Sequence, residues 1–317
     1  MRRLLARLRV RRAPASSASL DQVASTVHRL AVLLAAGVTP AASWSYLGDA
    51  FGNTVTRARE NGLGIPDAIR RELAGDLAVD DPVARAWSAV ATAWDVASQA
   101  GAPLASTLRQ HAAALRSTAA VERDIGTALA GPISTARIVL ALPALGVVFG
   151  AALGFDSLRV LFTTPAGITC LIVGLTLVGV ALGWIRSLVR AARSGEPNPG
   201  LRCDLMAIAV SGGASLDRAT ATVERALVAS GLPATTGRAQ AEEVLALSRR
   251  AGVPAAELLR GEAEEARRAA ASDAGRRASV LGVRLMLPLG ACILPAFMVL
   301  GVVPLLIAVI SSTVVGF

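Results

Sequence analysis

Three long uncharged runs dominate the hydropathy pattern of the chain. Eighteen uncharged residues lie between Arg137 and Asp156, twenty-six lie between Arg159 and Arg186, and the chain carries no charge from residue 285 to its end. A helix needs roughly 20 apolar residues to cross the hydrocarbon core of a bilayer. We therefore predict three membrane spans, at about 138–155, 166–185 and 285–311, the first two joined as a hairpin over 137–186.

Outside these runs, apolar residues recur at the three- and four-residue spacing of an amphipathic helix, with no alternating strand pattern. The pattern predicts an all-α integral membrane protein with two related cytoplasmic helical-bundle domains and three transmembrane helices. We expect a basic arm at 1–20, cytoplasmic domain 1 at 21–136, cytoplasmic domain 2 at 187–284 and an external tail at 312–317.

A fourth run, residues 30–48, also lacks charge, but its second half is polar and follows a turn signal at Gly37. Its counterpart at 210–217, around Gly212, contains Asp217, which is costly inside a membrane. Both segments are therefore predicted to be soluble helix-turn-helix units.

The internal repeat continues further along the chain. Gly101 and Pro103 correspond to Gly252 and Pro254, and in each copy a charged helix follows and leads into an apolar run. A glycine at a helix end commonly adopts the left-handed conformation. We therefore predict left-handed turns at four glycines: Gly37, Gly101, Gly212 and Gly252.

Arginine placement predicts the orientation of the spans. Arginines precede the first span, follow the second and precede the third, whereas the loop between the first two offers only Arg159. By the positive-inside rule, we predict a multi-pass membrane protein whose amino terminus and 187–284 region are cytoplasmic.

Composition limits the chemistry. The mean hydropathy is +0.55, the net charge is +9, and every basic residue is arginine. Without lysine, a P-loop, a Schiff-base enzyme or a Ser-Lys hydrolase has no ammonium group. The three cysteines are scattered, and His28 and His111, interpreted as helix-surface residues, lack a carboxylate cluster. We expect no catalytic site, cofactor, metal or nucleic-acid partner, and we interpret Asp80, Asp81 and Pro82 as a helix start.

Two further features suggest contact surfaces. Small residues spaced four apart let membrane helices approach closely, which points to packing, within the hairpin or between protomers, at Gly146, Gly150, Gly154, Gly179 and Gly183. A charged helix near residue 260 is a solvated face or a partner-docking face, with its candidate residues at Glu257, Arg260, Glu264 and Arg268.

These features together resemble the F-type platform proteins of bacterial type II secretion and type IV pilus machines, most closely the Flp (tight-adherence) pilus branch. The resemblance covers roughly residues 23–310 and rests on three short motifs, their duplication and their order before the spans: residues 33–41, 61–69 and 100–104. One departure is that the acidic stretch common in secretion members is replaced here by residues 96–101 and 248–252.

The resemblance implies a non-enzymatic inner-membrane platform without a cofactor. It implies a cytoplasmic secretion or pilus ATPase, pilin subunits and a sister platform protein as partners, in a homo- or hetero-oligomer. The alternative is a small-molecule transporter or permease subunit, for which Pro295 and Pro304 could break the third span.

Overall fold

The computed structural model describes residues 14–47, 50–76, 81–152, 162, 164–193, 196, 198–304, 306 and 307, and these residues form helices and turns without strands. The all-helical part of the prediction is confirmed. The chain divides into two compact units: unit 1 comprises residues 1–124 and 196–272, and unit 2 comprises residues 125–195 and 273–317.

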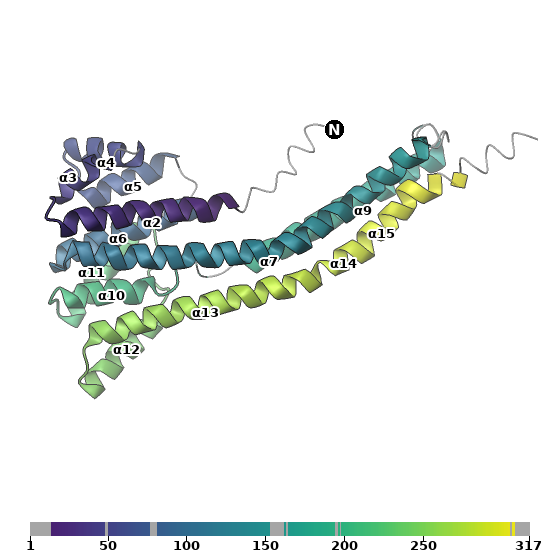
Figure 1. Ribbon diagram of the computed structural model, residues 1–317. Helices are drawn as coiled ribbons and strands as arrows, with labels where there is room; N and C mark the ends of the chain where they lie inside the picture. The colour runs from purple at the N-terminus through teal and green to yellow at the C-terminus, as the bar shows by residue number, and fades with distance from the viewer. Residues whose placement is uncertain are drawn as a thin grey trace, which may run out of the picture. The chain divides into compact units, whose positions relative to one another are not determined.

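Unit 1 is built from ten helices or parts of helices among its described residues (Figure 1). They are α2 (Pro14–Ala35), α3 (Pro40–Ser45), α4 (Ala50–Glu60), α5 (Ile65–Asp76), α6 (Pro82–Ala100), the start of α7 (Leu104–Ala152), α10 (Leu201–Ser211), α11 (Leu216–Ala229), α12 (Arg238–Ala251) and most of α13 (Ala255–Arg284). The helix α2 begins inside the segment predicted as a basic arm, whose residues 1–13 lie outside the described part.

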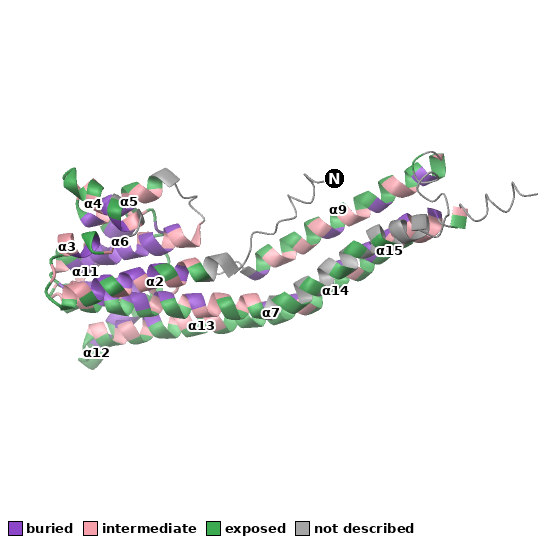
Figure 2. Cartoon of the chain, turned by 45° about the horizontal axis from the view of Figure 1, so that its top comes forward, coloured by how far each residue is buried: buried purple, intermediate pink, exposed green. Residues whose placement is uncertain are grey.

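The centre of unit 1 is α6, which is buried along most of its length (Figure 2). The Asp81 carboxylate accepts a hydrogen bond from the Val83 amide at 2.9 Å, and Pro82 occupies the first helical position. Both residues suit a helix start. The free amides at that end need an acceptor, which the Asp81 carboxylate supplies, and Pro82 is tolerated because the amide of the first residue makes no hydrogen bond within the helix. The predicted helix start at this site is confirmed for Asp81 and Pro82; Asp80 lies outside the described residues.

Two cores form on opposite faces of α6. Trp87, Val90 and Trp94 pack with α2, α3 and α5, and Trp44 lies 6.0 Å from Trp87 between ring centroids. The other face packs against α10, α11, α12 and α13 through Ala89, Ala93, Val96 and Ala97. A helix that is apolar all round is buried on all sides.

The grouping differs from the two cytoplasmic domains predicted from the repeat. Residues expected in domain 1 and residues expected in domain 2 belong to one compact unit. The physical reason is the second apolar face of α6, which the helices of the first copy leave uncovered and which α10 and α11 bury.

Unit 2 contains α9 (Pro165–Arg193) and a carboxyl-terminal helical stretch. That stretch continues from the end of α13 through α14 (Met286–Pro288), η1 (Leu289–Ile293), α15 (Leu294–Phe297) and η2 (Met298–Val302). On α9 the contacting residues recur along one stripe, Gly174, Ala181, Ile185, Leu188 and Ala192. Most of the other large apolar side chains of α9 are exposed, including Ile172, Leu175 and Val180.

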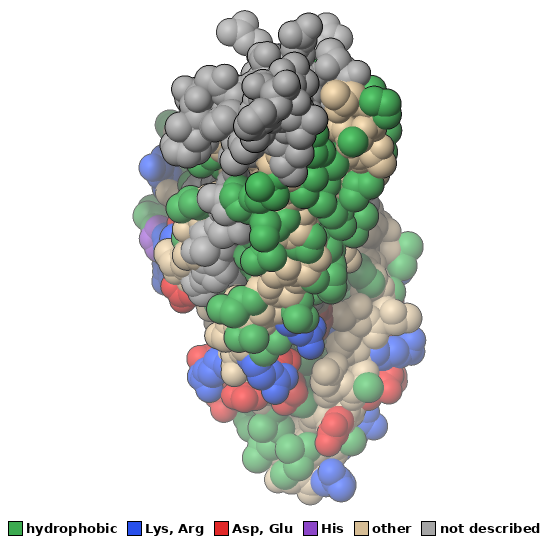
Figure 3. Space-filling model, turned by 90° about the vertical axis from the view of Figure 1, so that its right-hand side faces the viewer, with side chains coloured by type: hydrophobic (Ala, Val, Ile, Leu, Met, Phe, Trp, Pro, Cys, Tyr) green, Lys and Arg blue, Asp and Glu red, His purple; other side chains and the backbone are tan. Residues whose placement is uncertain are grey.

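Two described helices are long and apolar enough to cross a membrane, Pro165–Ala192 and Ala255–Val302. They include the second predicted span and residues 285–302 of the third predicted span. In Figure 3, hydrophobic side chains gather over much of the described surface in the upper part of the view. Residues 138–152 of the first predicted span are helical as the end of α7, and residues 153–155 and the tail 312–317 lie outside the described part.

Pro295 and Pro304 of the third run do not break the described helix. The residue before each of these two prolines makes a wide π-type hydrogen bond: the Leu294 amide donates to the Leu289 carbonyl, and the Val303 amide donates to the Met298 carbonyl. A π turn widens the helix where a proline ring would otherwise strike the carbonyl four residues earlier. The helix therefore continues past Pro295 to Pro304.

Candidate functional site

Three of the four predicted turn glycines have the left-handed conformation. Gly37, Gly101 and Gly252 have φ angles of 86°, 70° and 69°. An added Cβ at any of them would meet no described atom within 4 Å. These glycines are therefore required by backbone conformation and not by close packing.

The turns at Gly101 and Gly252 are closely alike. Their ψ angles are 20° and 21°, and each amide donates to the carbonyl four residues earlier, Ala97 in one copy and Ser248 in the other. Pro103 and Pro254 stand directly before α7 and α13, and their carbonyls accept the first hydrogen bonds of those helices. The repeat predicted at these two turns is confirmed as a local structural repeat.

The prediction for Gly212 is wrong. Gly212 has φ −77°, and the left-handed residue of this turn is Gly213, with φ 88°. With Gly37 matched to Gly213, the next helices begin alike: Thr39 and Ser215 are both N-caps that accept a hydrogen bond from the amide three residues on. The repeat is therefore displaced by one residue, because two adjacent glycines made the register ambiguous in sequence.

Gly212 is required for a different reason. An added Cβ would lie 2.2 Å from the carbonyl oxygen of Ala100, well inside contact distance. The turn between α10 and α11, in the second copy of the repeat, therefore packs against the end of α6, in the first copy. Only glycine permits this approach of two backbones.

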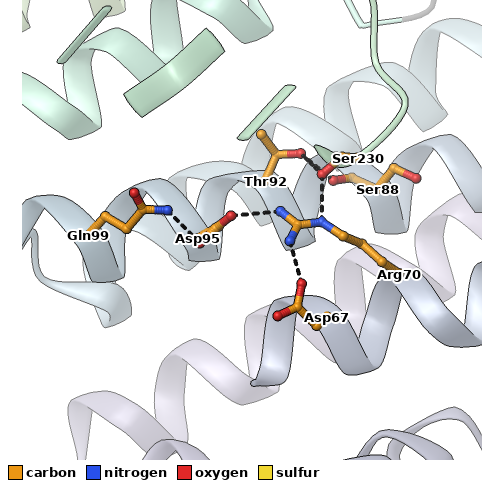
Figure 4. A network of polar contacts seen from close by, with 7 residues as sticks. All are labelled: Asp67, Arg70, Ser88, Thr92, Asp95, Gln99 and Ser230. Atoms are coloured by element: carbon orange, nitrogen blue, oxygen red, sulfur yellow. Dashed lines mark hydrogen bonds and ion pairs between the residues drawn. The ribbon is translucent and has the colours of Figure 1, made fainter. Parts of the chain in front are cut away.

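A polar network ties the same two copies together (Figure 4). Arg70 of α5 donates to Asp95 of α6 at 2.8 Å and to the Ser230 hydroxyl, which follows α11, at 3.0 Å. Thr92 Oγ1 lies 2.7 Å from Ser230 Oγ, and Arg70 also pairs with the exposed Asp67 at 2.8 Å. The mostly buried guanidinium and carboxylate compensate one another, as burial requires.

The candidate docking face on α13 is divided. Glu257, Glu264 and Arg268 are exposed, and Arg268 pairs with Glu264. Arg260 is half-buried, and its Nε is buried without a hydrogen-bond partner among the described residues. The prediction is therefore corrected for Arg260, which flanks the buried stripe formed by Leu259 and Ala263.

Arg267, next to the exposed Arg268, also turns inward. Its guanidinium lies 2.6 Å from the Asp204 carboxylate of α10. Burial raises the pKa of Asp204, and the Arg267 charge opposes that rise. One signal for this pair was present in the sequence, because Asp204 is a charged residue within the mostly apolar run of α10.

His111 is another correction, because it is buried and not on the helix surface. Burial, assisted by the nearby positive charge of Arg267, lowers the pKa of His111 to about 4. Its Nε2 has no hydrogen-bond partner among the described residues. The neutral imidazole thus fills a core position, while His28 is half-buried.

Within the described part of the chain, no group of three or more His, Cys, Asp or Glu side chains could hold a metal ion. The three cysteines are free thiols, and Cys203 and Cys292 are buried. Burial, with nearby carboxylates, raises the pKa of the Cys203 thiol to about 11, so it stays protonated.

Known proteins give no match. The chain fits no protein-family model and is not significantly similar to a curated protein or to a solved structure.

Two of the predicted membrane-packing glycines, Gly179 and Gly183, make no close contact with another helix within the described structure. An added Cβ at Gly179 or Gly183 would meet no described atom within 4 Å. The close approach is instead at Gly174, where a Cβ would lie 2.2 Å from Leu300 Cγ. Gly146 and Gly150 lie in α7 with undescribed surroundings, and Gly154 lies outside the described residues.

Proposed function

We propose that this chain is a non-enzymatic platform protein of the inner membrane, in a type II secretion or Flp-type pilus assembly machine. In this role the cytoplasmic helices contact a secretion ATPase, and the spans gather pilin subunits together with a sister platform protein. The protein transmits motion and needs no cofactor of its own.

The observation that carries the proposal is the pair of matched turns at Gly101 and Gly252. Each turn starts a long helix, α7 or α13, that leads from a charged segment into an apolar one. A duplicated helix of this kind can connect a cytoplasmic partner to the membrane at two points. Two helices long and apolar enough to cross a membrane support the membrane part of the proposal.

The arrangement of the exposed charges on α13 supports a docking role. Glu257, Glu264 and Arg268 lie seven and four residues apart, so they follow one another along a single face. Arg267 and Arg260, which lie toward the core, leave that face to the three exposed side chains. A face of mixed charge is suited to orienting a partner more than to strong binding.

The test is purification of the full chain in mild detergent with the secretion ATPase of the same cell. The two proteins should co-purify, and the chain should change the ATPase rate while hydrolysing no ATP alone. ATP hydrolysis by the chain that survives removal of contaminating ATPases would contradict the proposal. Solute uptake by proteoliposomes containing only this chain would favour the transporter alternative.

A charge-swapped variant tests the docking face separately. Glu264→Arg with Arg268→Glu keeps the net charge and an ion pair at the same spacing, so folding should be retained. Loss of ATPase stimulation with unchanged protease resistance would assign the contact to this face. Unchanged stimulation would remove the face from the proposal.

A further inference from the structure

Unit 2 contains a cavity of about 260 Å³ between the end of α9 and the end of α13. Three arginines line it, Arg276, Arg277 and Arg284. Its other walls are apolar and include Leu188, Ala192 and Leu281. None of its described lining residues is acidic, so the cavity combines concentrated positive charge with an apolar base.

The arginines differ in how far they are neutralised. Arg276 pairs with Asp273 at 2.8 Å, and both side chains are exposed. The Nε of Arg277 is buried and has no hydrogen-bond partner among the described residues. A buried guanidinium nitrogen without an acceptor favours an anionic ligand with oxygen atoms, because such a donor is costly to leave unsatisfied.

The cavity lies where a membrane surface is expected. Arg284 directly precedes the third predicted span, and Ala192 ends the candidate span on α9. Exposed apolar side chains flank the lining residue Arg284 in sequence, namely Val283, Met286 and Leu287. A ligand seated here would find basic groups at one end and an apolar surface at the other.

We propose that this cavity binds the phosphate of an anionic phospholipid, with the acyl chains lying on the adjacent apolar surface of α13 and α14. Basic cavities between membrane helices at the cytoplasmic side bind such head groups. Unit 2 carries eight arginines and two aspartates, so it attracts anionic lipid over zwitterionic lipid. The inference rests on the proposed membrane placement but not on the platform role.

The experiment measures lipid retained by the purified full chain in mild detergent, by native mass spectrometry, after exposure to phosphatidylglycerol or phosphatidylcholine. The wild-type chain should retain phosphatidylglycerol selectively. The Arg277→Gln, Arg284→Gln double variant should retain at least roughly tenfold less phosphatidylglycerol, since each arginine near an anionic surface raises the affinity for anionic lipid roughly fivefold. A control with the same charge loss is Arg186→Gln with Arg190→Gln, two exposed arginines at the end of α9 that do not line the cavity.

A second variant keeps the arginines and blocks the site. Val280 lines the cavity and is partly exposed, so Val280→Glu places a competing carboxylate beside the arginines without filling the core. It should also lose phosphatidylglycerol selectivity at an unchanged melting temperature. Inorganic phosphate, tested alone at millimolar concentration, should leave the melting temperature unchanged.

Equal lipid loss in the cavity variant and the control would show general charge attraction and overturn the site. Stabilisation by inorganic phosphate alone would assign the cavity to a soluble anion and also overturn it. Alkaline extraction of membranes separates the two proposals. Release of the chain into the soluble fraction would refute the membrane placement itself, whatever the lipid result.

Discussion

Gly212 packs against the carbonyl oxygen of Ala100, so closely that a Cβ on Gly212 would lie 2.2 Å from it. The two residues belong to different copies of the internal repeat. This contact fixes how the α10–α11 turn meets the end of α6, and it explains a glycine whose own φ angle would admit any residue.

Gly212→Ala should destabilise unit 1 by about 1–3 kcal/mol, because the backbone of one turn must move to admit a methyl group. Thermal unfolding in detergent measures the effect. The control is Gly261→Ala, at a helical position with no described atom within 4 Å of an added Cβ; it should be neutral or stabilise by up to about 1 kcal/mol. Equal melting temperatures for the two variants would contradict the contact.

Gly101→Val and Gly252→Val should each destabilise by about 1–2 kcal/mol, because both residues have positive φ. Since both copies share one compact unit, either variant should raise protease sensitivity across unit 1, not only in its own copy. Membrane insertion should be unchanged. Cleavage confined to one copy would show that the copies unfold separately, and unchanged protease resistance would show that these glycines are incidental.

Arg70→Met should cost about 1–3 kcal/mol, because it leaves the mostly buried Asp95 carboxylate without its cation. Arg71→Met, at the exposed neighbouring position, is the matched control and should change little. A double-mutant cycle of Arg70→Met with Ser230→Ala measures the link between the copies, and a coupling of at least about 0.5 kcal/mol is expected. Additive effects would mean that the hydrogen bond between Arg70 and Ser230 contributes nothing.

Unit 1 should lose stability as the pH falls from about 6.5 toward 4. Burial holds the pKa of His111 at about 4, below its ordinary value of 6.5. In this window the unfolded chain binds a proton that the folded chain excludes, so acid favours unfolding, by up to roughly 3 kcal/mol. Burial also raises the pKa of Asp204 above its ordinary value of 3.8 and the pKa of Glu196 above 4.5, and both carboxyls have the opposite slope, so the contribution of His111 is read from the difference between the wild type and a His111 variant.

Thermal unfolding of the wild type and of His111→Leu across that range tests the assignment. The leucine variant should show a smaller slope, and His28→Leu, which removes the half-buried histidine of the same unit, is the comparison variant. An identical slope in all three proteins would contradict a buried neutral His111.

A reporter that is active only outside the cytoplasm should work when fused after Phe317 or near Thr163 and should fail near Gly200. The arginine bias predicts that the region after the second span is cytoplasmic. Activity near Gly200 with silence after Phe317 would invert the topology.

The sequence alone determined the features that depend on near neighbours in the chain. Helical spacing predicted an all-α fold, Asp81 and Pro82 predicted a helix start, and Gly101 with Pro103 predicted a turn that recurs at Gly252 and Pro254. Capping, turn conformation and apolar length are local properties, so a short segment contains the information they need.

Only the tertiary structure decided which side of each helix is covered. Arg267 and Arg268 are adjacent in sequence, yet one pairs with Asp204 in the unit and the other pairs with Glu264 on the surface. His111 and Gly212 likewise owe their roles to helices about a hundred or more residues away. Local patterns do not contain such contacts, because burial is decided by the partner helix that arrives from elsewhere in the chain.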